Sequence, residues 1–151
     1  MIIRDILNLK GNAIFSIAPY GRVADAVAAM VEHDIGSLVV MESDAMLGML
    51  TFREVLRGLH AQHGNLGDLP VSEVMVHEPP VCAPDDSADG VRDRMTQQHV
   101  RYLPVVDGIE RGRLLGVISF HDIAKAAIKE ANFENRLLKR YIKNGPAEED
   151  A

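Results

Sequence analysis

The 151-residue sequence contains one cysteine, Cys82, so no disulfide bond can form within the chain. It also lacks any apolar run near the roughly 18 residues that a membrane-spanning helix requires. Its first residues, 1–5, do not have the layout of a signal peptide. These absences predict a cytoplasmic protein that does not enter a membrane.

Basic residues are in the minority, because 16 Lys and Arg stand against 22 Asp and Glu for a net charge of −6. They are scattered rather than clustered, which argues against nucleic-acid binding and still allows a local phosphate pocket. The sequence has no Walker loop, G-x-G-x-x-G, H-E-x-x-H or G-x-S-x-G motif. It also shows no nucleophile–base pair and no metal-ligand cluster, so we expect neither an enzyme nor a metal site.

What the sequence does contain is a pattern that occurs twice, at 47–54 and again 68 positions later at 115–122. Each copy runs from a turn into an apolar strand, then to a hydroxyl residue and, three residues later, to a carboxylate. The short apolar segments 3–7 and 71–75 have the same offset. These correspondences predict an internal duplication that covers most of the chain.

The two halves also share the order of their predicted elements. Each begins with an extended segment, continues with an amphipathic helix and two strands rich in β-branched residues, and ends in another helix. The predicted segments are 14–19, 23–31, 37–41, 47–51 and 53–63 in the first half, and 80–84, 88–95, 102–106, 114–119 and 121–143 in the second.

The amphipathic helix of each half differs at its start. Ser87 is placed to cap the helix of the second half, because its hydroxyl can accept from a free backbone N–H. Its counterpart Arg22 cannot cap in this way, so the first helix is expected to begin more loosely. The apolar stripe of that first helix consists of Val23, Ala26, Val27, Met30 and Val31.

These elements predict an α+β fold of two β-α-β-β-α units related by pseudo-twofold symmetry. One unit of about 60 residues buries too little surface to be stable alone, and pairing two of them supplies the missing core. We place the first unit, with its entry turn, at 1–66 and the second at 67–130. Residues 131–151 are predicted to form an extension of the last helix and a disordered acidic tail.

Three stretches, 71–75, 100–107 and 116–122, resemble the CBS domain, the module named after cystathionine β-synthase. The second half fits this family closely and the first half loosely, and the sequence is identified as a tandem pair of such domains. The resemblance implies ligand sites in the cleft between the paired units, which take adenosine nucleotides. It also implies a regulatory rather than a catalytic role, and association into flat dimers through helices.

The second copy of the repeated pattern is the stronger candidate for a ligand site. Ser119 and Asp122 share one face of a helix start, where a carboxylate can accept from the vicinal ribose hydroxyls and free N–H groups attract phosphate. By resemblance, residues 81–83 line the adenine, while Arg101 and Tyr102 face phosphate or ribose. The predicted ligand-binding residues of this half are Val81, Cys82, Ala83, Arg101, Tyr102, Gly116, Val117, Ile118, Ser119, His121 and Asp122.

The first copy departs from that pattern, since Glu54 replaces the aspartate and Gly36 stands in the place of Arg101. This weaker site either borrows charge from Arg53, Lys10 or the paired unit, or is empty. A hydroxyl followed by a carboxylate is also an ordinary capping box; we favour ligand binding for the second copy and leave the first open. The residues of the weaker site are Ile14, Phe15, Ser16, Gly36, Ser37, Leu50, Thr51, Arg53 and Glu54.

The sequence therefore predicts a stand-alone regulatory module that binds an adenosine nucleotide and passes a conformational change to an unidentified effector protein. AMP is the first choice of ligand, with ADP, ATP or NAD as alternatives. The competing interpretation is a structural module for protein interaction that has lost its ligand. A homodimer is expected, and the apolar residues of the last helix that could serve either the core or that interface are Ile123, Ala124, Ala127 and Ile128.

Overall fold

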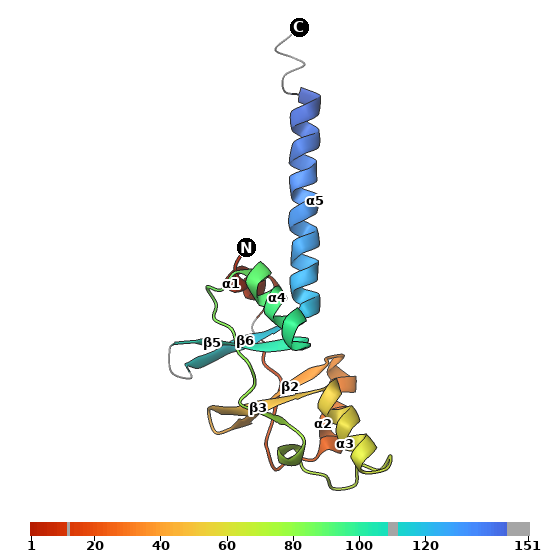
Figure 1. Cartoon of the computed structure of the whole chain (residues 1–151). Coiled ribbons are helices and arrows are strands. Elements are labelled where there is room, and N and C mark those ends of the chain that lie inside the picture. The colour runs from red at the N-terminus through yellow and green to blue at the C-terminus, as the bar shows by residue number, and fades with distance from the viewer. Residues whose placement is uncertain (12, 109–111, 145–151) are drawn as a thin grey trace.

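The computed structural model describes residues 1–11, 13–108 and 112–144. Figure 1 shows two α+β halves stacked on each other, with one long helix that projects from the second half. The predicted tandem arrangement of two similar units is confirmed. The predicted acidic tail at 145–151 lies outside the described residues.

The first half is built on a four-stranded sheet in the order β1-β2-β3-β4. β1 (Ser16–Ile17) lies parallel to β2 (Ser37–Glu42), which pairs antiparallel with β3 (Ala45–Thr51). β4 (Val76–His77) completes the sheet antiparallel to β3. Helices α2 (Val23–His33) and α3 (Phe52–Ala61) pack with this sheet, and α3 begins directly where β3 ends.

The second half contains a two-stranded antiparallel sheet of β5 (Tyr102–Asp107) and β6 (Arg113–Ser119). Helix α4 (Ala88–Gln98) precedes β5, and α5 (Phe120–Asn144) follows β6 directly. The extended segment expected at 80–84 is reduced to a single bridge between Cys82 and Val105. The predicted order of elements is thus kept, except that the strand expected at 80–84 is reduced to this bridge and β4 at 76–77 was not predicted.

The helix starts agree with the predicted difference between the halves. The Ser87 hydroxyl accepts from the Gly90 N–H at 3.0 Å, whereas Arg22 makes no side-chain cap on α2. The predicted stripe of α2 is too wide, because Val23 is buried while Val31 is 77% exposed. The face of α2 that packs in the core of the first half is therefore narrower than the apolar pattern predicted.

The entry segments of the two halves are exchanged. Helix α1 (Ile3–Lys10) buries Ile3, Ile6 and Leu7 in the core of the second half. The short 3-10 helix η1 (Val71–Glu73) places Val71 in the core of the first half instead. Each half therefore depends on a segment of the other half, which ties the two units together.

The described helices contain no obvious membrane segment. Within residues 1–11, 13–108 and 112–144, none of them combines the length and the apolarity that crossing a bilayer demands.

Candidate functional site

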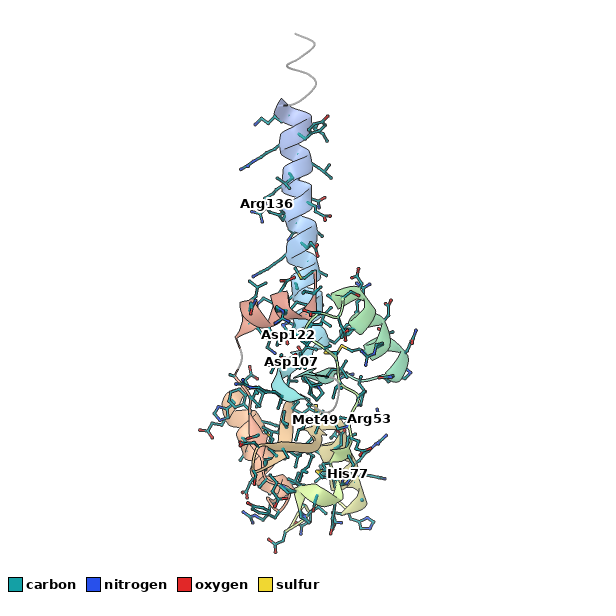
Figure 2. The ribbon with its side chains drawn as sticks, turned by 90° about the vertical axis from the view of Figure 1, so that its left-hand side faces the viewer. Met49, Arg53, His77, Asp107, Asp122 and Arg136 are labelled. Carbon is teal, nitrogen blue, oxygen red and sulfur yellow. The ribbon has the colours of Figure 1, made fainter. Side chains whose placement is uncertain are left out.

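A cavity of about 600 Å³ lies between the two halves. This volume falls within the range of small-molecule sites. Figure 2 shows Met49 and Arg53, two of its lining residues, in the lower half of the molecule, and Asp122 above them at the base of α5. The cavity is lined by Met49, Thr51, Phe52, Arg53, Glu54, Leu56, Arg57, Val76, Pro79, Pro80, His99, Val100, Arg101 and Tyr102.

Thr51 and Glu54 occupy the wall where β3 passes into α3. The Thr51 hydroxyl accepts from the Arg53 N–H at 3.3 Å and donates to the Glu54 carboxylate at 3.0 Å. The Thr51 N–H also donates to Glu54, at 3.3 Å, and Glu54 is only 5% exposed. Glu54 is longer than aspartate by one methylene group, and its carboxylate folds back to complete a capping box.

The polar part of the cavity is dominated by positive charge. Arg53 and Arg57 are one helical turn apart on α3, and Arg101 lies just before β5 on the opposite half. In the part of the chain that the structure describes, none of these three guanidinium groups forms an ion pair with a carboxylate. The cleft is thus locally basic in a protein whose net charge is −6.

Tyr102 connects this cleft with the second predicted site. A Cβ on Gly36 would collide with the Tyr102 hydroxyl and would come within 2.6 Å of the Phe52 ring, so a larger residue there would have to push both side chains aside. Burial raises the pKa of Tyr102, and the nearby charge of Asp122 raises it further, while Arg101 lowers it. Its side chain therefore lies at the boundary between the two repeated motifs.

Ser119 and Asp122 form a reciprocal capping box at the start of α5. The Ser119 N–H donates to Asp122 Oδ2 at 2.9 Å, and the Asp122 N–H donates to Ser119 Oγ at 3.0 Å. The Lys10 ammonium donates to the same Asp122 oxygen at 2.6 Å and to the Val117 carbonyl at 2.9 Å. The predicted ribose-binding carboxylate is thus engaged by a lysine from the exchanged helix α1.

The electrostatics of Asp122 reflect these contacts. Burial tends to raise the pKa of its carboxyl, but the hydrogen bonds from Lys10 and from the Ser119 backbone outweigh burial and hold the pKa below its ordinary value. The suggestion that Lys10 lends charge to the first site is wrong, because its ammonium is held at Asp122 in the second half.

The segment predicted to line adenine is already hydrogen-bonded to the protein. The Cys82 N–H donates to the Pro104 carbonyl at 3.0 Å, and the Cys82 carbonyl accepts from the Val106 N–H at 2.9 Å. The Ala83 N–H donates to Asp86, and the Val81 carbonyl accepts from Arg94. Burial raises the pKa of the Cys82 thiol to about 12. These groups are therefore engaged in holding the segment against β5 and α4.

Most other predicted residues lie away from the cavity. Gly116 packs against Leu7, Ile118 is fully buried and His121 is exposed. In the first half, Leu50 belongs to the core and the Phe15 ring lies 4.7 Å from that of His33. The remaining predicted residues that do not line the cavity are Ile14, Ser16, Gly36, Ser37, Val81, Cys82, Ala83, Val117, Ser119 and Asp122.

The structure thus regroups the two predicted sites. It joins Thr51, Arg53 and Glu54 of the weaker site with Arg101 and Tyr102 of the stronger one. Sequence reasoning missed several lining residues, namely Met49, Phe52, Leu56, Arg57, Val76, Pro79, Pro80, His99 and Val100. Arg57 had a detectable signal, since it follows Arg53 at the i+4 spacing of one helix face.

A metal site is not evident among the residues that the structure describes. Across the described parts of the chain, no three His, Cys, Asp or Glu side chains gather in a way that could hold an ion.

Fold and cleft together define a duplicated α+β module with a ligand-sized cavity between its halves. The family model of the CBS domain matches residues 3–61 and 71–129. The chain belongs to the CBS-domain family, with two copies of the domain.

Relatives support this assignment over most of the chain. The CBS domain-containing protein YhcV of Bacillus subtilis is 32% identical over 111 residues, which are 74% of this chain and 76% of YhcV. A putative signal-transduction protein with CBS domains from Burkholderia ambifaria is 31% identical, with a TM-score of 0.79 over 85% of this chain and 95% of that structure.

Two more distant structures share the fold and carry ligands. The CBS domain pair of MJ0100, in complex with 5′-methylthioadenosine and S-adenosyl-L-methionine, is 20% identical with a TM-score of 0.73. CBSX2, in complex with AMP, is also 20% identical, with a TM-score of 0.68. Each likeness covers 86% of this chain and 98% of the other. At this identity the likeness establishes the fold alone.

Proposed function

We propose that this protein is a regulatory module that binds an adenosine nucleotide in the cleft between its CBS domains. The observation that carries the proposal is a cavity of about 600 Å³ where three guanidinium groups lack carboxylate partners among the described residues. An anionic ligand would supply the missing charge. Adenosine compounds bound to proteins of this fold support the choice of ligand class.

The lining residues suggest how such a ligand would be held. Arg53 and Arg57 of the first half line the same cavity as Arg101 of the second half, so a phosphate bound there could accept forked hydrogen bonds from both halves. Pro79 and Pro80 offer apolar surface on which a base can rest. AMP remains the first choice, and three arginines can also serve the longer phosphate chains of ADP and ATP or the pyrophosphate of NAD.

We assign the ligand to the Thr51 side of the molecule rather than to the Ser119 side. Asp122 is bound by Lys10 and by the Ser119 backbone, so a nucleotide there would have to displace an internal ion pair. The Thr51 side adjoins the open cavity. Binding across both halves would favour one arrangement of them, to the extent that the two arrangements differ in affinity. An unidentified cytoplasmic effector protein would read that change, without catalysis by this chain.

A ligand-free interaction module is the second candidate function. Both repeated motifs satisfy their carboxylates internally, Glu54 through Thr51 and Asp122 through Ser119 and Lys10. Neither carboxylate therefore needs ribose hydroxyls to satisfy its hydrogen-bonding capacity. If this interpretation is correct, nucleotides have no effect and the protein acts through its surface alone.

Calorimetric titration of the protein with AMP, ADP, ATP, NAD and S-adenosylmethionine separates the two candidates. We expect at least one of them to bind, and Arg101→Gln to weaken that binding about tenfold or more, because a hydrogen bond between charged groups contributes about 1.5–3 kcal/mol. Arg113→Gln, which removes the same charge from an exposed position on β6, is the matched control and should leave the affinity unchanged. If none of the five binds at millimolar concentration, the nucleotide proposal fails.

A further inference from the structure

Helix α5 continues far beyond the body of the protein (Figure 1). Its first turns are anchored, with Ile123 and Ala126 in the core of the second half. Every residue from 128 to 143 is exposed, and the match to the CBS-domain model ends at 129. We call this exposed segment, 128–143, the α5 extension.

The α5 extension carries more apolar surface than a solvated helix needs. Its exposed apolar side chains are 48–73% accessible: Ile128, Phe133, Leu137, Leu138, Tyr141 and Ile142. Glu134, Leu137, Leu138 and Tyr141 gather on one face, at the i, i+3, i+4 and i+7 spacing of a helix–helix contact. The extension therefore has the properties of one helix of a packed helical pair.

The charges of the extension indicate which helix is its partner. On the helix face that contains Leu137, acidic Glu130 and Glu134 precede this residue and basic Arg140 follows it. The other basic residues of the extension lie at the sides of this face or opposite it: Lys129, Arg136, Lys139 and Lys143. A helix whose contact face is acidic before its centre and basic after it is complementary to a copy of itself running in the opposite direction. Such self-complementarity is the requirement for a twofold-symmetric contact.

We propose that the α5 extension pairs with the α5 extension of a second copy of this chain in an antiparallel dimer centred on Leu137. In this register Glu134 lies opposite Arg140 of the second copy, and Phe133 lies opposite its Tyr141. A parallel pair would instead set Glu134 beside Glu134 and Arg140 beside Arg140, and like charges repel. The two bodies then lie at opposite ends of the helical pair.

This contact is distinct from the flat dimer that the family resemblance implies, and it does not depend on the nucleotide proposal. An interface made of one helix from each copy buries less surface than the roughly 800 Å² per partner that is typical of stable complexes. We therefore expect a dimer in the micromolar range, measurable by sedimentation velocity over a concentration series.

Charge reversal tests the pairing directly. Glu134→Lys should raise the dissociation constant about tenfold, because two attractive pairs become repulsive, and adding Arg140→Glu should restore it. Leu137→Glu should leave the protein monomeric, while Lys139→Glu, on the face away from Leu137, is the control that should change little. The concentration series should reach about 100 μM, well above a micromolar dissociation constant. The proposal is overturned if the wild type is still monomeric at that concentration, or if Arg140→Glu does not restore the dimer of the Glu134→Lys variant.

A spin label on Lys129→Cys tests the direction of the helices. Cys82 is buried and its pKa is raised to about 12, so the introduced cysteine reacts first. In the antiparallel dimer the two labels lie about 24 Å apart along the helix axis, from a rise of about 1.5 Å per residue. Labels found side by side would show a parallel pair and overturn the antiparallel arrangement.

Discussion

Replacing Lys10 with methionine tests whether Lys10 blocks the second of the two predicted ligand sites. Lys10 is the last residue of α1, the helix exchanged into the second half, and its ammonium reaches Asp122 at 2.6 Å and the Val117 carbonyl at 2.9 Å. Methionine keeps most of the length of the side chain and removes the charge. The substitution therefore frees the Asp122 carboxylate without emptying the space around it.

The loss of stability follows from the exposure of the pair. The Lys10 and Asp122 side chains are 34% and 17% exposed, so the pair is neither fully buried nor fully solvated. Its contribution to stability should therefore lie between that of a buried charged hydrogen bond, about 1.5–3 kcal/mol, and that of a surface ion pair, about 0.2–1 kcal/mol. After discounting for solvent screening, we expect a loss of about 1 kcal/mol. For a chain of this size that lowers the midpoint of thermal unfolding by about 2–4 °C. Lys125→Met, at an exposed position on α5, is the matched control.

The sharper readout of Lys10→Met is ligand stoichiometry. In the wild type we expect one nucleotide per chain, in the cleft beside Thr51, with Asp122 occupied by Lys10. In the variant a second, weaker binding event should appear in calorimetry, because Asp122 becomes free to accept from ribose hydroxyls. Two equal sites in the wild type, or a variant with unchanged stability and stoichiometry, would refute the role given to Lys10.

Two further predictions concern acid stability and packing. The folded-state pKa of Asp122 is lowered, so its contribution to stability is present above the ordinary value of 3.8 and is lost as pH falls through the folded-state pKa. In Asp122→Asn the midpoint of thermal unfolding should therefore fall less steeply between about pH 5 and pH 2 than in the wild type. An unchanged slope would contradict this assignment. Gly36→Ala should destabilise the protein by roughly 1–3 kcal/mol in urea unfolding by pushing Tyr102 and Phe52 aside, and Tyr102→Phe in the same chain should recover part of that loss.

The sequence was sufficient for the local elements of each half. Ser87 caps α4 as predicted, and both copies of the repeated pattern run from a strand into a helix. These features depend on neighbours within a few residues, where hydroxyl position and apolar spacing are decisive. The CBS-domain pair also followed, because the order of its motifs is visible along the chain.

The exchange of entry segments could not be predicted in the same way. Leu7 and Met75 occupy equivalent positions in the two halves and are both apolar, so nothing in either side chain specifies which core it enters. The contact between Lys10 and Asp122 joins residues 112 positions apart. The grouping of Thr51 with Arg101 is also long-range, and a duplicated pattern suggests pairing within a half rather than across halves.

The exchange limits how a ligand in the cleft can act. Separating the two halves would strain the connection between α1 and β1, because α1 belongs to the second core and β1 to the first sheet. Pulling α1 free would expose Ile3, Ile6 and Leu7, at roughly 1.5–3 kcal/mol for each buried side chain. A bound phosphate contributes a few charged hydrogen bonds of about 1.5–3 kcal/mol each, which at best matches that loss. A change in the angle between the halves, about their crossing connections, leaves α1 in the second core and avoids that loss, so we expect a bound ligand to act through such a change.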